Sequence, residues 1–243
     1  MTSAPTPVPR PAPRGHDLRL AALLVLVFLG TVIFLAVQHD FFRSSANNLR
    51  TQGSGVAAIQ TRHLQAFDAV QLAGANTVVI RVGDRQSITV HADDNLLDRV
   101  TTRVETGNLV IGNAPGSFTT RSPMRVDITV PTLTALTLAG SGTISASGID
   151  TSRLRVVLSG SGVIRAGGST GQLEVTVPGS GDAQLEELVA RDVDAVVNGS
   201  GRIVVTPTRS LHAEVPGSGA ILYTGNPAHV TTSVTGSGIV SHG

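Results

Sequence analysis

Six copies of Gly-Ser-Gly are the residues in this 243-residue chain that most invite a chemical interpretation. The copies begin at Gly140, Gly160, Gly179, Gly199, Gly217 and Gly236. A glycine-rich loop can cradle a phosphate, but such a loop must open a helix whose N-terminus faces the phosphate. Each copy here is followed by a strand pattern, and none is followed by Gly-Lys-Ser or Gly-Lys-Thr. The six copies therefore indicate architecture, and we expect no nucleotide site at them.

The serines of these motifs also lack the surroundings of a nucleophile. They are Ser141, Ser161, Ser180, Ser200, Ser218 and Ser237. A nucleophile elbow has the pattern Gly-x-Ser-x-Gly, which is absent at these corners, and no acid or histidine recurs beside the serines. We therefore expect no catalytic residue here and interpret the protein as a non-enzyme.

Histidines and acids offer weaker chemical signals. No two of the seven histidines stand at metal-ligand spacing, although stacked repeats could bring His212 and His229 together. One repeat gathers acids and arginines that could hold a cation or a sugar, but a solvated charged face is the more common arrangement. These residues are Asp182, Glu186, Glu187, Asp192, Asp194, Arg191 and Arg202. We expect no metal site and no cofactor.

The spacing of the motifs predicts the elements that position them. Successive copies follow one another at a nearly constant interval of about 19 residues. Apolar residues alternate with others on both sides of each copy, which is typical of strands with one buried face. A nearly fixed period requires that equivalent residues coincide in successive layers about 4.8 Å apart. The sequence therefore predicts an all-β fold, a parallel β-solenoid with about 19 residues per coil.

The glycines of the motifs are the structural site residues of this prediction. A sharp corner is expected to need a positive φ angle, which glycine adopts without a Cβ penalty. These corner glycines are Gly140, Gly142, Gly160, Gly162, Gly179, Gly181, Gly199, Gly201, Gly217, Gly219, Gly236 and Gly238.

The solenoid is expected to begin before the first Gly-Ser-Gly. Gly74-Ala75-Asn76 has the same flanking alternation and is interpreted as a degenerate corner, since Asn also visits the left-handed region. Residues 81–130 contain strand-like runs without a corner, at 87–90, 100–105, 109–111 and 124–130. They form irregular first coils, a cap, or a separate small β domain. Gly53-Ser54-Gly55 is out of register and is assigned to a linker.

Composition excludes several classes of function. The formal net charge is +1, so phosphate neutralisation does not drive binding to nucleic acid. The chain has no Cys, which excludes disulfides and thiolate metal sites. Aromatic residues make up only 3%, whereas Gly numbers 27, and this combination favours thin, regular β structure with frequent turns.

The N-terminal segment predicts a membrane anchor. Residues 20–37 form an apolar run of about 27 Å as a helix, long enough to cross a hydrocarbon core. More arginines precede it than follow it, which predicts a cytoplasmic N-terminus. A cleaved signal peptide is the alternative. We expect a Pro-rich cytoplasmic tail (1–17), a transmembrane signal-anchor helix (18–38), a flexible spacer (39–61) and the solenoid domain (62–243). This predicts a single-pass protein of the bacterial inner membrane, with its domain periplasmic or extracellular.

The chain also resembles a known family. The resemblance lies in segments 62–70, 78–83, 87–90, 94–97 and 104–111, followed by the Gly-Ser-Gly array, and covers about residues 62–241. It is similar to the bacterial head GIN domain family, described as "putative auto-transporter adhesin". The resemblance implies a solenoid-like all-β fold and an extracytoplasmic setting, and it implies no catalytic residue.

Three functions are consistent with these features. The first is an anchored binding or structural module that holds an envelope protein or glycan along its strand faces. The second is a scaffold that self-associates as a homo-oligomer through open solenoid ends. The third is a polysaccharide-active enzyme, which would need a coherent acid–base cluster on one face.

Overall fold

The computed structural model describes residues 50–243, and this part of the chain is all β apart from one short 3-10 helix. The predicted tail (1–17) and membrane helix (18–38) lie outside the described residues. Within residues 50–243, no helix is long and apolar enough to cross a membrane.

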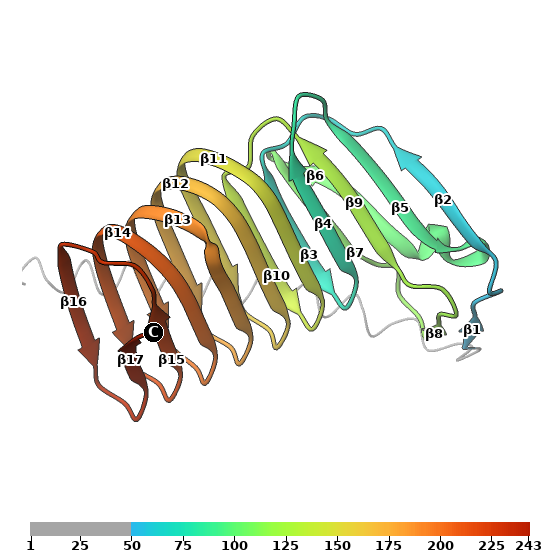
Figure 1. Ribbon diagram of the computed structural model, residues 1–243. Helices are drawn as coiled ribbons and strands as arrows, with labels where there is room; N and C mark the ends of the chain where they lie inside the picture. The colour runs from blue at the N-terminus through green and yellow to red at the C-terminus, as the bar shows by residue number, and fades with distance from the viewer. Residues whose placement is uncertain (1–49) are drawn as a thin grey trace, which may run out of the picture. The chain divides into compact units, whose positions relative to one another are not determined.

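The strands form two faces joined at the Gly-Ser-Gly corners (Figure 1). Strands that lead into a corner build one face, here called the pre-corner face, in the order β6, β7, β3, β10, the second halves of β11 to β14, and β16. Strands that leave a corner build the post-corner face, in the order β2, β5, β9, β4, the first halves of β11 to β14, β15 and β17. β1 and β8 belong to neither face and pair with each other as a separate 2-stranded sheet. The bounds of all strands are β1 (Thr51–Gln52), β2 (Ala57–Arg62), β3 (Ala69–Gly74), β4 (Thr77–Val82), β5 (Ser87–Asp93), β6 (Val100–Glu105), β7 (Asn108–Asn113), β8 (Phe118–Thr119), β9 (Arg125–Val130), β10 (Ala135–Gly140), β11 (Thr143–Leu158), β12 (Val163–Val177), β13 (Asp182–Val197), β14 (Arg202–Val215), β15 (Ala220–Tyr223), β16 (His229–Val234) and β17 (Ile239–His242).

Successive layers pair in parallel and keep the same offset on both sides of a corner. Leu138 pairs with Leu158 before the corner, and Ile144 pairs with Ile164 after it. The offset changes only at the bend opposite the corners, where β11, β12 and β13 each show a register shift. The unequal motif spacing is therefore absorbed at the bend, and the corners stay aligned.

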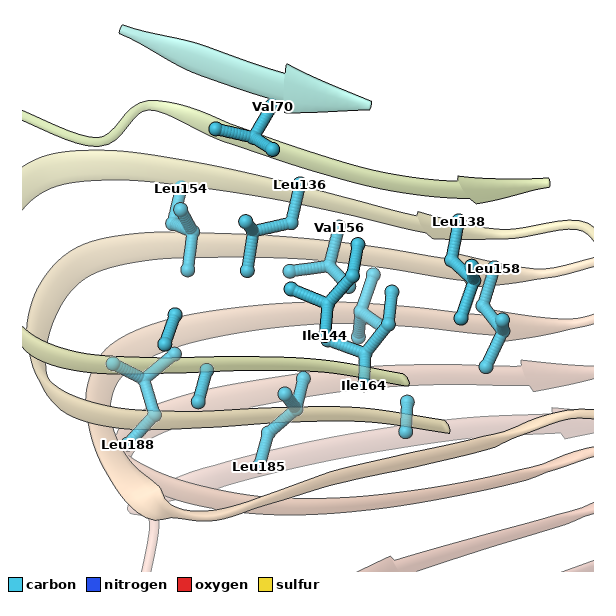
Figure 2. Packing of buried hydrophobic residues seen from close by; sticks show 14 of the residues in the cluster. Val70, Leu136, Leu138, Ile144, Leu154, Val156, Leu158, Ile164, Leu185 and Leu188 are labelled. Carbon is cyan, nitrogen blue, oxygen red and sulfur yellow. The ribbon is translucent and has the colours of Figure 1, made fainter. Parts of the chain in front are cut away.

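The core lies between the two faces (Figure 2). Leu136 and Leu138 point inward from the pre-corner face, and Ile144 and Ile164 point inward from the post-corner face. The alternation of apolar residues is what places them there, because every second residue of a strand faces the same side. Val234, at the equivalent position of the last layer, remains 43% exposed.

The N-terminal layers depart from the simple repeat. Strands β7 and β9 run parallel to their neighbours β3 and β4, whereas β5, β6 and β2 pair antiparallel to the strands beside them. The 3-10 helix η2 (Asp94–Arg99) connects β5 to β6. Residues 81–130 thus contribute one parallel layer and an antiparallel cap.

The layer formed by β3 and β4 lies between strands that come much later in the sequence. Gly74 pairs with Gly140, far along the chain, and β4 lies between β9 and the first half of β11. Gly74-Ala75-Asn76 occupies the corner of this layer, since the carbonyls of Gly74 and Asn76 accept hydrogen bonds from the amides of Gly142 and Thr143.

The predicted spacer needs a correction at its C-terminal end. Residues 51–52 and 57–62 are strands, and β2 pairs with β5 along its whole length, so this part of the 39–61 segment belongs to the folded domain. The backbone of β2 is hydrogen-bonded to β5. The sequence of β2 does not alternate clearly between apolar and polar residues, and for this reason it was not predicted as a strand.

Candidate functional site

The corner glycines are required by crowding and not by a positive φ angle. Gly140 has φ 159°, at the margin of extended backbone, and no other corner glycine lies in the positive-φ region. A Cβ at Gly181 would lie 2.6 Å from Cδ2 of Leu158 and 2.7 Å from the carbonyl oxygen of Gly162. A Cβ at any other corner glycine from Gly140 to Gly238 would lie as close to an atom of the preceding layer. The expectation of left-handed backbone was therefore wrong, also for Asn76, which has no positive φ.

The corner serines point to solvent. All six are exposed, and none of their hydroxyls has a hydrogen-bond partner among residues 50–243. The corners are held by backbone bonds instead, such as the amide of Asp182 donating to the carbonyl of Gly162 at 3.0 Å. These serines form an exposed row along the edge of the stack.

The acids predicted to cluster in one repeat are distributed over different surfaces. Asp182 lies at the start of β13 on the post-corner face, and Glu186 and Glu187 lie at the bend. Asp192 lies on the opposite face, where Arg209 bonds its carboxylate through Nε at 2.6 Å and Nη2 at 2.5 Å. These bonds, with help from Ser210 and Arg191, hold the pKa of Asp192 far below its usual range. Asp192 and its partners thus form a charged network on the surface, and the acids of this repeat do not share one position at which a ligand could bind.

The histidines do not converge either. His212 pairs in register with Thr231, while His229 pairs with Ser210, so the two histidines are offset along neighbouring strands. His212 bonds Glu214 on its own strand at 3.0 Å. No group of three or more potential metal ligands occurs within the described range.

A polar groove on the post-corner face is the strongest candidate for a binding site. Its centre is Asp127 on β9, which contacts Arg125 through Nε at 2.7 Å and Nη2 at 2.6 Å, and Nε2 of His91 at 2.9 Å. His91 and Arg125 are directly paired across β5 and β9, which explains why the three side chains meet. His91 and Asp127 each remain about one-third exposed, so solvent and ligands can reach them.

Two hollows meet at this cluster. The first has a volume of about 300 Å³ and is lined by Val79, Arg81, Ser87, Thr89, Arg125, Asp127, Ile128 and Thr129. The second has about 520 Å³ and is more apolar, with Ala57, Ala58, Ile59 and Pro123 beside His91, Arg125 and Asp127. Both linings include Arg125 and Asp127, so the two hollows adjoin across strands β2, β5, β9 and β4, and together they are called the groove. Volumes in this range suit a small ligand or a few units of an extended one.

Sequence reasoning missed this groove. Alternation along residues 125–130 places Arg125, Asp127 and Thr129 on one side of a strand, and that was the available signal. The other residues that line the groove come from β4 and β5, and no repeated motif in the sequence indicates that these two strands pair with β9.

A buried carboxylate fastens the segment beside the groove. Asp93 is fully buried and accepts hydrogen bonds from the amides of Gly55 at 3.1 Å, Arg121 at 2.8 Å and Ser122 at 3.2 Å. The Arg121 amide contributes most to lowering the pKa of Asp93, and burial opposes it. Gly53-Ser54-Gly55, interpreted above as a linker, is therefore a turn built around this carboxylate.

Known proteins share both sequence features and the fold of this domain. The sequence model of a family described as "Putative auto-transporter adhesin, head GIN domain" matches residues 66–227. A crystal structure of a "putative adhesin" from Bacteroides fragilis superposes with a TM-score of 0.66 at 19% identity, covering 79% of this chain and 99% of that chain. A "putative lipid binding protein" from Parabacteroides distasonis gives a TM-score of 0.55 at 24% identity, covering 80% and 99%. No curated protein matches. At these identities the structures share the fold.

Proposed function

The chain belongs to the family described as "putative auto-transporter adhesin, head GIN domain", and on that premise we propose that it is a binding module of the bacterial cell envelope. In this proposal a single-pass anchor in the inner membrane carries the domain on the outer side, with the N-terminus in the cytoplasm. The domain then holds another envelope macromolecule, a glycan or a protein, on its strand faces.

We propose further that the stack is a β-solenoid. The support is the register: equivalent residues of successive layers pair in parallel, and each corner glycine from Gly160 to Gly238 lies against a corner glycine of the layer before it. Stacked layers of this kind give a rigid, extended surface, which suits the binding of long or repetitive partners. The anchor is supported by the sequence alone, through the apolar run at residues 20–37.

The groove around Asp127 is the observation that carries the binding proposal. It is the place where a charged cluster, free hydroxyls and apolar side chains converge on two adjoining hollows. Asp127 is engaged by Arg125 and His91, so it shapes the groove and is not set up as a free base. The comparisons name adhesins and a lipid-binding protein, and we propose no catalytic role.

Envelope cross-linking with the full-length protein tests this function. A photoreactive residue at Thr89, which lines the groove, is expected to capture an envelope component. The same probe at Thr176, on the pre-corner face, is the matched control. Capture at Thr89 with little at Thr176 supports the proposal. Equal capture at both positions, or none at either, contradicts it.

A scaffold that self-associates through its ends is the second candidate, and one observation favours it. Large exposed apolar residues concentrate in or next to the terminal layers. They are Val56 and Ile59 at one end and Val230, Val234 and Ile239 at the other, with only Val189 elsewhere among the exposed residues of the described range. Two such ends could stack, because each presents unpaired strand groups.

The size of the full-length protein in detergent distinguishes this candidate. Ile239→Asn is expected to reduce the oligomer, whereas Val189→Asn, an exposed valine in the middle of the stack, is expected to leave it unchanged. A wild-type protein that sediments as a monomer at high concentration would exclude end-to-end association.

A further inference from the structure

The groove contains one arginine that the protein itself does not use. Arg81 is exposed near the end of β4, and it has no hydrogen-bond or ion-pair partner among residues 50–243. Arg125, the other arginine of the groove, is committed to Asp127 through two of its nitrogens. Arg81 is therefore the guanidinium that a ligand can engage at no cost to an existing ion pair.

Hydroxyl groups surround this arginine. Thr129 is the direct cross-strand neighbour of Arg81, and Ser87 is the neighbour of Thr129 on its other side. Paired residues have their Cβ atoms about 5 Å apart. Thr89 completes the set in the lining of the same hollow. In the described part of the chain, the hydroxyls of Ser87, Thr89 and Thr129 have no hydrogen-bond partner, so they can bond a ligand.

Charge selects the class of ligand. Asp127 is the acid in the lining of the first hollow, and Arg125 and His91 already face it. The remaining charge of the hollow is that of Arg81, which favours an anion. A planar guanidinium matches a carboxylate with two parallel hydrogen bonds, and the three hydroxyls match a partner rich in hydroxyls.

Size and shape narrow the class further. A hollow of about 300 Å³ is large enough to hold a sugar ring. The adjoining hollow of about 520 Å³ offers Ile59, Ala57 and Pro123 to the apolar side of a neighbouring ring. The two hollows share a border at Arg125 and Asp127, so an extended chain can cross from one to the other.

We propose that this groove binds an acidic polysaccharide, with the carboxylate of a uronic acid residue held by Arg81. This ligand assignment rests on the proposed binding function. The polysaccharide passes over Asp127, and its next sugar unit packs against Ile59. Ser87, Thr89 and Thr129 bond the hydroxyls of the ring whose carboxylate Arg81 holds.

Binding of an oligogalacturonate to the full-length protein in detergent tests the assignment, with its methyl ester as the neutral matched probe. We expect the acid to bind at least about tenfold more tightly than the ester, because the ester cannot form the charge-assisted pair. Arg81→Gln is expected to remove this preference. Arg165→Gln is the control, since Arg165 is an exposed arginine of the same face outside the groove lining.

The variants separate loss of folding from loss of the site. Arg81→Lys keeps the charge and lacks the planar fork, so we expect it to recover part of the preference while Arg81→Gln recovers none. Thermal unfolding of all variants confirms that they fold. Equal binding of acid and ester, equal effects of Arg81→Gln and Arg165→Gln, or no binding of either probe overturns the assignment. If Thr89 still captures an envelope protein in that case, the ligand class is wrong and the binding function stands.

Discussion

The carboxylate of Asp93 fills the space that a side chain at Gly53 would need. The turn at Gly53-Ser54-Gly55 is thus shaped by the end of β5, a strand distant in sequence, and the same carboxylate holds the amides of Arg121 and Ser122. One side chain therefore joins three segments at the N-terminal end of the domain.

Asp93→Asn is expected to loosen this end of the domain. An amide offers one acceptor oxygen in place of two, and its NH2 group would face backbone amides that also donate. We expect a lower thermal midpoint for Asp93→Asn, while Asp98→Asn, an exposed aspartate of η2, stays near the wild type. Hydrogen exchange should rise at residues 53–55 and 121–122. Equal midpoints for the two variants would show that the Asp93 contacts contribute nothing.

The contribution of Asp93 is also expected to depend on pH. Its pKa is lowered in the folded protein from the ordinary value of 3.8, so folding favours the ionised form. The stabilisation is complete above the unfolded pKa and is lost as the pH falls through the lower, folded pKa. Urea unfolding of wild type and Asp93→Asn at a series of pH values should give a constant difference near neutrality. That difference should shrink below about pH 4. A difference that grows on acidification contradicts this assignment.

Gly181→Ala is expected to destabilise the stack strongly. Its Cβ would lie 2.6 Å from Leu158 and 2.7 Å from Gly162, and the backbone of the preceding layer cannot move away without breaking the corner ladder. Overpacking of this kind costs about 1–3 kcal/mol or more of unfolding free energy. Ser180→Ala, at the exposed position next to it, should change the unfolding free energy by less than about 0.5 kcal/mol. Denaturant titration of both variants measures the contrast, and similar values would refute the crowding explanation.

Equivalent valines of two layers should respond differently to truncation. Val215 is fully buried, whereas Val234, its partner one layer on, is 43% exposed. Loss of two buried methyl groups with the cavity that remains costs about 2 kcal/mol, so Val215→Ala should destabilise by that amount. Val234→Ala should cost under about 0.5 kcal/mol in the monomer. A large, concentration-dependent cost at Val234 would indicate that a second copy covers the terminal layer.

The repeating part of the fold was predictable because period and alternation coincide there. The spacing of the glycines and the apolar positions beside them predicted parallel strands on both sides of each corner, and the strands from β10 to β17 follow that pattern. The reason given for the glycines was wrong. One sequence does not show how closely two layers approach each other. The glycines were therefore explained by a positive φ angle, whereas they are needed because a Cβ would clash with the preceding layer.

The N-terminal part and the groove could be predicted only in pieces. The strand-like runs at 87–90, 100–105, 109–111 and 124–130 correspond to β5, β6, β7 and β9. Their order in the sheet was not accessible, because antiparallel pairing leaves no repeated motif and β4 pairs with β11, far along the chain. Arg81, His91 and Asp127 come together only through that order, so no local pattern could mark them as one site.

The interleaving of β3 and β4 has a consequence for how the chain folds as it is made. From β11 onward, each layer finds its partner about 20 residues away, so closure of each loop is cheap and the stack can grow by addition. Strands β3 and β4 are made early, but β7 and β9 cover only one edge of each, and the other edge stays open until β10 and β11 have been made. During synthesis these early strands are therefore completed only after β10 and the first half of β11 have been made, and a chain stalled before residue 135 would leave one edge of each of the two strands exposed.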